Sequence, residues 1–412
     1  MPRIIMHLDM DSYFASVEQQ ANPRLRGLPI GITGKPIEST IIVTASREGK
    51  KFGLKAGMPV WEAKKLCPNL LLVPGDGSKY LAITQRFIDI LKRVTPMLEV
   101  SSIDEVYMDV TQEAPRHGGV IRLAQSIQRE FERELGSYIT ATIGISDNKT
   151  FAKLIAKRFK PNGIGFLDPE EMPELLETTS VSEICGIGSR IEKRLSRLGI
   201  WTLKQLGQCP VPILKKEFGV YGAFYKAVGL GQDPSPIIPY TDIPPPKSVG
   251  HSRTLPPDIR DRELALTVLR GLCDLVASRL RQHGYMARTV HCGFSLEVMS
   301  GHFGKQTTLA LPSDDGASIY EACMRILSMI PVKPESMARV SVSTSNLVDE
   351  KGVPIPLLPE DQTRRRLNQA IDIIQNRYGR GAIQVAAAAL PRKLPEHVGG
   401  FAEASSFDFS SN

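Results

Sequence analysis

The sequence has few cysteines and no long apolar segment. Its six cysteines include no C-x-x-C pair and no neighbouring histidine at zinc spacing, so we expect reduced core thiols. No apolar run approaches the ~20 residues that a membrane helix needs. The first residues also lack the layout of a signal peptide. The sequence therefore predicts a cytoplasmic protein without a membrane partner.

The charge balance is basic. The 412 residues contain 51 Lys and Arg against 44 Asp and Glu, which gives a formal net charge of +7. This excess favours a polyanionic partner, because basic side chains release counterions from nucleic acid. With 42% hydrophobic residues the chain can bury ordinary cores. Its length predicts several modules of roughly 100 to 150 residues.

Hydrophobic periodicity predicts a mixed α/β organisation in the first part of the chain. Strands are expected over 4–10, in two pieces within 100–110, and over 139–145, and helices over 12–20, 78–94 and 120–135. A small subdomain is expected after the first strand. Together these elements predict an α+β sheet with helices on one face.

The second part changes pattern twice. Residues 168–231 are helical in pattern, and the six prolines within 232–247 predict an extended tether. From 248 to 345 the order strand, helix, strand, strand, helix, strand predicts a second sheet of ferredoxin-like type. A tail follows, with one helix expected over 362–378 and disorder from residue 394.

Two distant motifs carry the strongest chemical signal. HLDMDSYFA at 7–15 and SSIDEVYMD at 101–109 place Asp9, Asp104 and Glu105 inside otherwise apolar strands. A carboxylate is costly there without a cation, and Mg²⁺ prefers hard oxygen ligands. Two such ions ~3.5 to 4 Å apart can clamp the attacking and leaving oxygens of nucleotidyl transfer. The plainer alternatives are a solvated Asp-Glu turn and helix capping, and capping is our interpretation of Asp11.

The combination of motifs resembles the Y-family of translesion DNA polymerases, nearest its DNA polymerase IV branch. Further blocks in the same order are FGLKAGMP at 52–59, NKTFAK at 148–153, KPNG at 160–163 and KSVG at 247–250. The resemblance implies an α+β right-hand polymerase with a ferredoxin-like palm, small fingers, a helical thumb with a helix-hairpin-helix, and a tethered ferredoxin-like little finger.

The resemblance also implies domain limits and a reaction. The implied limits are palm 1–10 and 78–167, fingers 11–77, thumb 168–231, linker 232–247, little finger 248–346, and a partly disordered tail 347–412. The implied reaction is low-fidelity, template-directed transfer of dNTPs onto the primer 3′ end of primer-template DNA. Such an enzyme serves DNA repair and damage tolerance, is mutagenic, and is expected to be a monomer.

Metal-ligand roles follow from matching positions. The resemblance implies that Asp9 and Asp104 bridge two Mg²⁺ ions, that Glu105 binds the ion at the primer end, and that the Met10 carbonyl completes the nucleotide-side ion. Phe14 matches the steric gate that excludes ribonucleotides. Tyr13 is grouped with it on the nucleotide-binding side, where we expect its ring to pack.

The triphosphate positions match only in part. Thr44 and Lys160 stand where the family grips the β- and γ-phosphates. Arg47 replaces the usual Tyr and Lys50 replaces the usual Arg. Lys lacks the guanidinium fork, so we expect Arg47 to take over part of the phosphate contact.

The expected DNA contacts lie in two modules. Gly186 and Gly188 form a G-h-G turn that presents backbone N–H groups to phosphates, followed by Arg190 and Lys193. In the second sheet module the candidate backbone contacts are Arg253 and Arg288, together with Arg279, Arg281 and Lys305. For each of them a solvated surface position is the alternative.

The tail carries a degenerate sliding-clamp signal. Arg364 to Ala370 matches the helix that follows the clamp motif in the family, while VPIPLLP at 353–359 replaces the motif itself. Clamp binding through Leu357 and Leu358 is therefore a hypothesis, with 407–409 as a weaker candidate. Two alternative functions remain: a catalytically weak DNA-binding relative acting as a scaffold, and a nucleotidyl cyclase or signalling enzyme with a similar palm.

Overall fold

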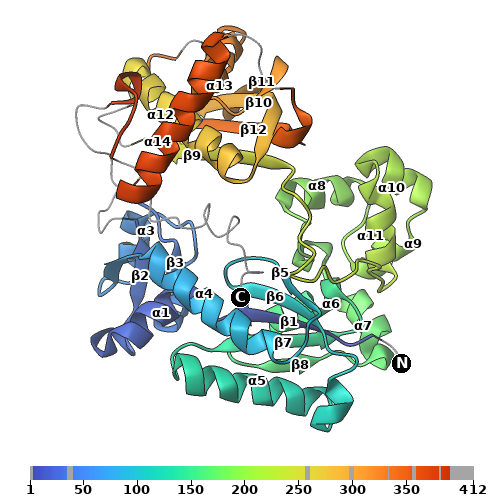
Figure 1. The fold of residues 1–412 in the computed structure, drawn as a ribbon. Coiled ribbons are helices and arrows are strands. Elements are labelled where there is room, and N and C mark those ends of the chain that lie inside the picture. Colours follow the sequence, from blue (N-terminus) through green and yellow to red (C-terminus); the bar gives the residue numbers. More distant parts are fainter. Residues whose placement is uncertain are drawn as a thin grey trace. The chain divides into compact units, whose positions relative to one another are not determined.

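The protein forms two compact units. The computed structural model describes residues 3–34, 40–255, 260–296, 301–332, 334–354, 359–379 and 382–389. The first unit ends at Ile243 and the second begins at Pro244 (Figure 1). This boundary lies within the segment predicted as a linker. Among the described residues, no helix is long and apolar enough to cross a membrane.

A five-stranded sheet, here called the central sheet, organises the first unit. Its order is β5 (Leu98–Val100), β6 (Glu105–Asp109), β1 (Ile5–Met10), β7 (Ala141–Ser146) and β8 (Ile164–Phe166). The middle strand β1 is antiparallel to both neighbours, and β7 and β8 are parallel. Every residue of β1 is buried, as its apolar run predicts.

Helices cover both faces of the central sheet. On one face, α4 (Gly77–Lys92) and α5 (Val120–Leu135) share a core with Met6 and Leu8 of β1. On the other face, α6 (Lys149–Arg158) packs against Ile5 and Tyr107 through Ala152. The expectation of helices on one face is therefore wrong, because the small residues of β7 admit α6 on the second face.

Gly144 permits this close approach. A Cβ at Gly144 would overlap the Ala152 carbonyl oxygen and the Ala156 nitrogen of α6.

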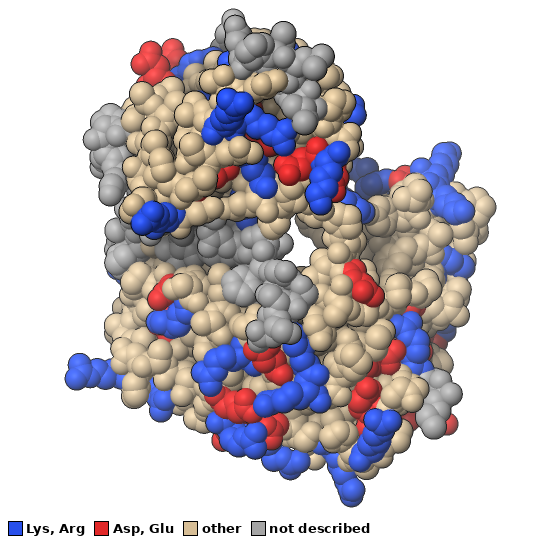
Figure 2. All heavy atoms as spheres, viewed as in Figure 1, with Lys and Arg blue, Asp and Glu red and all other residues tan. Residues whose placement is uncertain are grey.

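Helix α5 is amphipathic. Figure 2 shows basic and acidic side chains interspersed on the part of the surface where α5 lies. Its inward residues Leu123, Ala124 and Phe131 are buried, as the helical spacing predicts.

A small subdomain follows β1. Its sheet has the order β3 (Thr44–Ala45), β2 (Ile30–Thr33), β4 (Leu71–Pro74). Its helices are α1 (Tyr13–Ala21), α2 (Arg47–Lys51) and α3 (Val60–Leu66), with the 3-10 turn Pro23–Leu25. Ile42, Leu54, Val60 and Leu70 form its separate core.

A helical subdomain follows β8, as its sequence pattern predicts. It contains α7 (Met172–Thr178), α8 (Ser189–Arg197), α9 (Leu203–Gln208), α10 (Val211–Phe218) and α11 (Tyr221–Gly229), with 3-10 turns at Pro169–Glu171 and Val181–Glu183. A further 3-10 turn, Ala114–His117, lies before α5 in the central-sheet part. Phe151 and Leu154 of α6 belong to the same core as Leu195 and Leu203 of these helices. Helix α6 therefore contributes to two cores, one with the central sheet and one with the helical subdomain.

Part of the proline-rich segment is held against the central sheet. The Asp233 carboxylate accepts hydrogen bonds from the Thr150 backbone N–H (3.2 Å) and hydroxyl (2.8 Å). Glu99 of β5 accepts from the Ile238 N–H (2.8 Å), and the Tyr240 N–H donates to the Leu98 carbonyl (2.8 Å). The interpretation of the whole segment as a tether is therefore wrong for residues 233–240.

The second unit has the predicted ferredoxin-like order. Its antiparallel sheet runs β11 (His302–Ser313), β10 (Tyr285–Ser295), β12 (Arg339–Asp349), β9 (Ser248–Thr254). Its helices are α12 (Arg262–Gln282), α13 (Gly316–Ser328) and α14 (Pro359–Tyr378), with 3-10 turns at Glu350–Gly352 and Ala386–Ala388. One core joins α12 and α13 to the sheet. The disorder expected from residue 394 lies outside the described residues.

Polar contacts hold α14. The Asp372 carboxylate accepts hydrogen bonds from Arg281 Nε (2.6 Å) and the Ser278 hydroxyl (3.2 Å) of α12. The Asn368 amide donates to Asp315 at the start of α13 (3.0 Å). Leu367 and Ile373 of α14 are exposed. The helix is therefore attached by charge and hydrogen bonds more than by an apolar face.

We expect Gly144→Ala to destabilise the protein by about 2 to 3 kcal/mol, because the new methyl group would push α6 off the sheet. Urea denaturation followed by circular dichroism measures this change. Gly271→Ala is the control. Gly271 lies within α12, and a Cβ there would meet only Ala388, at the ordinary contact distance of 3.8 Å. A helical Ala there should be neutral or stabilising by up to ~1 kcal/mol. Equal stability of the two variants would contradict the packing argument.

Candidate active site

The sheet register brings together carboxylates from distant motifs. Asp9 lies directly opposite Glu105 in the antiparallel β1–β6 pair. Opposed residues in such a pair have Cα atoms about 4.5 to 5.5 Å apart. The Met10 N–H donates to the Asp104 carbonyl (2.9 Å), which fixes Asp104 beside the same strand end. The three predicted ligands thus meet where β1 ends and β6 begins.

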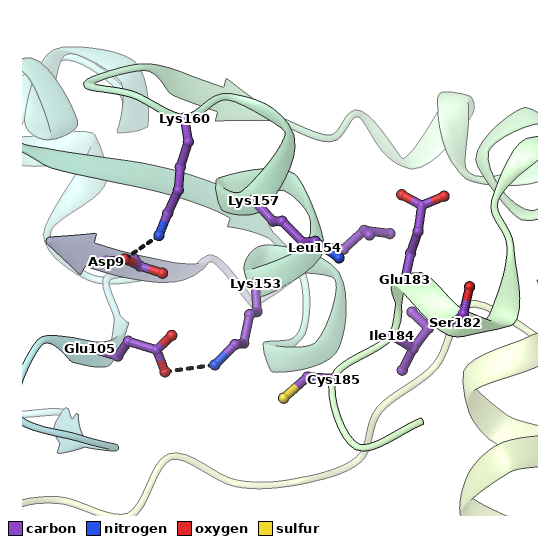
Figure 3. Close-up of a pocket in the computed structure, with 10 residues that line it drawn as sticks. All are labelled: Asp9, Glu105, Lys153, Leu154, Lys157, Lys160, Ser182, Glu183, Ile184 and Cys185. Atoms are coloured by element: carbon purple, nitrogen blue, oxygen red, sulfur yellow. Dashed lines mark hydrogen bonds and ion pairs between the residues drawn. The ribbon is translucent and has the colours of Figure 1, made fainter. Parts of the chain in front are cut away.

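Lysines balance two of these carboxylates. Lys160 Nζ lies 2.5 Å from Asp9 Oδ1, and Lys153 Nζ lies 2.6 Å from Glu105 Oε2 (Figure 3). The Asp104 carboxylate accepts a hydrogen bond from the Ser102 hydroxyl (2.7 Å). The side chains of Asp9 and Glu105 are only 13% and 19% exposed, so their charges are partly removed from water.

The pKa values show that this compensation is incomplete. Burial raises the pKa of Asp9 to about 7, with Lys160 opposing the shift and Glu105 and Asp104 adding to it. Burial also raises the pKa of Asp104. For Glu105, burial acts upward, but the hydrogen bond and charge of Lys153 lower the pKa below its ordinary value. The cluster therefore gains from additional positive charge.

The donor set fits a divalent cation that shares its coordination with a substrate. Carboxylate oxygens are the ligands that Mg²⁺ prefers, with water and phosphate in the remaining positions. Among the described residues, no three Asp, Glu, His or Cys side chains form a preformed metal cage. The reason is visible in the ion pairs, since Asp9 and Glu105 are directed towards separate lysines.

A group of cations lies beside the acidic cluster. Burial lowers the pKa of Lys50, and repulsion from Lys160 and Arg47 contributes to the shift. Arg47 begins α2 and Lys50 lies within it, while Thr44 lies half-buried in β3. Mutually repelling cations next to carboxylates form a site suited to a polyanion that carries its own metal ion.

The first turn of α1 carries the predicted gate. The Phe14 ring stacks on Tyr80 of α4, with centroids 4.2 Å apart and an interplanar angle of 16°. The Tyr13 hydroxyl donates to the Tyr80 carbonyl and shares a hydrogen bond with the Thr84 hydroxyl (both 2.8 Å). Tyr13 is therefore packed in the core, and Phe14 has a fixed ring orientation.

Asp11 does not cap α1, so that interpretation is wrong. Ser12 occupies the N-cap position in a left-handed conformation (φ 47°), without a side-chain cap hydrogen bond. The Asp11 carboxylate is buried and accepts hydrogen bonds from the Thr142 hydroxyl (2.8 Å) and the Asn162 N–H (2.8 Å). The chain bends at Ser12, which turns Asp11 towards β7.

Comparison with known proteins identifies similar chains over nearly the full length. Residues 8–157 match the impB/mucB/samB family, residues 246–357 its C-terminal domain, and residues 169–200 the HHH motif of the IMS family. DNA polymerase IV of Moorella thermoacetica is 36% identical over 93% of this chain and 96% of its own length. DNA polymerase IV of Pelotomaculum thermopropionicum is 34% identical over 97% and 98%.

A solved structure has the same fold. A Y-family DNA polymerase chimera of Dbh and Dpo4 aligns with a TM-score of 0.73 and 28% identity, over 84% of this chain and 99% of the chimera.

The chain belongs to the Y-family of translesion DNA polymerases.

The sequence interpretation missed one functional feature of this Y-family chain. Lys149, Lys153 and Lys157 recur every four residues and therefore share one face of α6. Lys149 pairs with Glu99 and Lys153 with Glu105 (both 2.6 Å). That spacing within and after the NKTFAK block was the available signal for a cationic face opposite the carboxylates.

A cavity of about 350 Å³ opens beside this cationic face (Figure 3). Its lining residues are Asp9, Glu105, Lys153, Leu154, Lys157, Lys160, Ser182, Glu183, Ile184 and Cys185. Asp9 and Glu105 come from the central sheet, and Leu154 and the three lysines come from α6 and the turn after it. The other lining residues, Ser182 to Cys185, come from the helical subdomain. The two subdomains thus form the cavity together.

The Y-family HHH motif is well formed. Gly186 has φ +92°, which disfavours other residues, and Gly188 is the N-cap of α8. A Cβ at either glycine would meet no described atom within 4 Å, so the hairpin backbone is open to a partner. Arg190 and Lys193 of α8 are exposed beside it.

The cations of the second unit differ in their surroundings. Arg288 is exposed at a β-bulge of β10, and Arg253 lies half-buried on β9. Arg279 is buried, and Arg281 forms its ion pair with Asp372. The structure therefore corrects the expectation that Arg279 and Arg281 contact DNA, because both side chains are engaged within the unit.

Proposed function

We propose that this Y-family polymerase extends primer 3′ ends by two-metal nucleotidyl transfer, with Asp9, Asp104 and Glu105 as the metal-binding carboxylates. The observation that carries the proposal is the pairing of Asp9 with Glu105 in the β1–β6 register, beside Asp104. Family membership implies a metal-dependent enzyme that acts on DNA and dNTPs. Magnesium, and two ions per site, are our finer assignment.

The carboxylates would share the ions as follows. Asp9 and Asp104 would contribute to both, Glu105 to the primer-side ion, and the Met10 carbonyl to the nucleotide-side ion. Bound there, the ions would neutralise the triphosphate and make the primer hydroxyl a better nucleophile. Before the ions bind, the ammonium groups of Lys153 and Lys160 pair with Glu105 and Asp9. They compensate the negative charges whose burial is costly.

The nucleotide would lie on the α1 and α2 side of the carboxylates. We assign the triphosphate to Thr44, Arg47, Lys50 and Lys160. The assignment is supported by Lys50, whose pKa burial lowers and whose charge is also repelled by Lys160 and Arg47. We assign sugar selection to Phe14. Its stacking on Tyr80 would keep the ring from moving aside, so that it collides with the 2′ hydroxyl of a ribonucleotide. Tyr13 would support that ring from the core.

The DNA would be held without sequence preference. The Gly186–Gly188 hairpin would grip phosphates through backbone N–H groups, with Arg190 and Lys193 alongside. In the second unit, Arg253 and Arg288 are the proposed backbone contacts. These assignments correspond to the palm, fingers, thumb, linker and little finger limits given above, which we retain as proposals together with a monomeric state.

Clamp binding stays a prediction. Leu357, Leu358 and residues 407–409 lie outside the described residues. The helix with Arg364 and Leu367 is α14, and Arg364 lies 3.8 Å from Asp315. Unchanged clamp affinity after deletion of residues 353–361 would dispose of the hypothesis.

Asp104→Ala should abolish primer extension, because the site loses a bridging carboxylate. Primer-template affinity should change less than about twofold, since phosphate contacts elsewhere supply binding. Gel-based extension and fluorescence anisotropy measure the two quantities. Ser102→Ala, which removes two hydrogen bonds with Asp104 but keeps its carboxylate, should retain extension. Primer extension by the Asp104→Ala variant would contradict the metal assignment. An inactive wild-type chain would favour the scaffold alternative.

Phe14→Ala should admit ribonucleotides, with at least about a tenfold fall in the preference for dNTP over rNTP measured as kcat/KM. Tyr80→Phe is the control, because it keeps the stacking ring and loses only the hydroxyl that donates to Glu18. Continued exclusion of ribonucleotides by a folded Phe14→Ala variant would show that another residue guards the sugar.

Arg190→Ala and Lys193→Ala should each weaken DNA binding. Each should reduce the slope of log affinity against log salt by about 0.9, the value expected for one lost phosphate contact. Arg133→Ala is the matched control. Arg133 is an exposed cation of α5 that forms ion pairs with Glu130 and Glu134. Slopes identical to that of the control would refute the hairpin assignment.

A further inference from the structure

The Asp11 carboxylate joins its own segment to two others, residues 140–142 and the turn at Asn162. Its Oδ2 accepts hydrogen bonds from the Thr140 hydroxyl (2.7 Å) and the Asn162 N–H (2.8 Å), and its Oδ1 accepts from the Thr142 hydroxyl (2.8 Å). The side chain is only 2% exposed. A buried carboxylate that accepts three hydrogen bonds has a fixed orientation, because rotating it would break them where water cannot replace them.

Thr140 connects this carboxylate to Arg47. The Arg47 guanidinium donates through Nη2 to the Thr140 hydroxyl oxygen, and Nη2 lies 3.9 Å from Asp11 Oδ2. The direction of both hydrogen bonds is determined, since a guanidinium only donates and an ionised carboxylate only accepts. Thr140 therefore relays the position of Asp11 to the first residue of α2.

Arg47 keeps donors for a further partner. Its Nε N–H is buried and has no hydrogen-bond partner among the described residues. A buried donor without an acceptor is unfavourable. The relay thus holds one end of the guanidinium, while the side chain as a whole is 35% exposed and remains accessible to an anion.

Asn162 connects the same carboxylate to Lys160. Asn162 has a left-handed backbone (φ 56°) in the turn after α6, and its N–H is the donor to Asp11. Lys160 lies two residues earlier in that turn, with its Nζ at Asp9. Fixing the turn therefore limits where the Lys160 side chain can reach.

We propose that Asp11 is a positioning residue for nucleotide binding. Through Thr140 it orients Arg47, and through the Asn162 N–H it fixes the turn that carries Lys160. This inference rests on the proposed function, in which Arg47 and Lys160 contact the triphosphate. Holding these long side chains in place before binding reduces the conformational entropy lost when the nucleotide arrives. Asp11 acts through its neighbours and is not assigned a contact with substrate.

Two isosteric variants separate positioning from simple structural support. Thr140→Val and Thr142→Val each remove one hydroxyl donor to Asp11, but only Thr140→Val breaks the connection to Arg47. The measured quantity is the Kd of dATP for the full-length chain on a template T, with Mg²⁺ and a dideoxy-terminated primer that cannot be extended. Thermal denaturation of both variants checks folding.

We expect Thr140→Val to raise the dATP Kd about fivefold, the effect of one hydrogen bond, and Thr142→Val to raise it less than about twofold. Arg47→Ala should raise the Kd at least as much as Thr140→Val. In the Arg47→Ala background, Thr140→Val should add little, because the residue it positions is gone.

The outcomes distinguish the relay from the site assignment. If Arg47→Ala raises the Kd while Thr140→Val behaves like Thr142→Val, the relay is overturned and the phosphate contact stands. If Arg47→Ala leaves the Kd unchanged, the phosphate contact of Arg47 fails, and the relay fails with it. If the effects of Arg47→Ala and Thr140→Val are fully additive, Thr140 acts independently of Arg47 and the inference is wrong.

Discussion

The structure of the first unit depends on a cluster of carboxylates. Burial and mutual repulsion make their ionised forms costly. Asp9 and Glu105 face each other across two adjacent strands, so the backbone register alone determines how close their charges must be. Burial and the neighbouring acids raise the pKa of Asp9 to about 7, although Lys160 opposes the shift. Such a cluster requires cations from elsewhere in the fold. Much of the surrounding structure serves to deliver and hold them.

Helix α6 delivers one of these cations and connects the site to its surroundings. It reaches the sheet over Gly144, where any side chain would collide with its backbone. From there Lys153 extends to Glu105, while Lys149 reaches Glu99, the residue that also accepts the Ile238 N–H of the linker. The packing of a single helix therefore sets the electrostatics of the site and anchors the chain that leads to the second unit.

The second unit follows a different design. Its sheet and two helices share an apolar core, whereas α14 is attached through Asp372 and Asn368 with Leu367 exposed. Two arginines that composition would offer to DNA, Arg279 and Arg281, are engaged inside the unit. A basic net charge thus indicates a nucleic-acid partner for this Y-family polymerase without showing which cations face it.

The sequence by itself determined the family and the order of elements, and it predicted that Asp9, Asp104 and Glu105 lie together, because local periodicity and contiguous motifs encode them. Helix α5 was predicted over its observed limits, Val120–Leu135. Only the tertiary structure decided the role of Asp11, the second helical face of the sheet and the docking of residues 233–240. Each depends on partners far along the chain, as Asp11 depends on Thr142 and Asn162, and no local pattern specifies which distant donor will satisfy a buried acceptor.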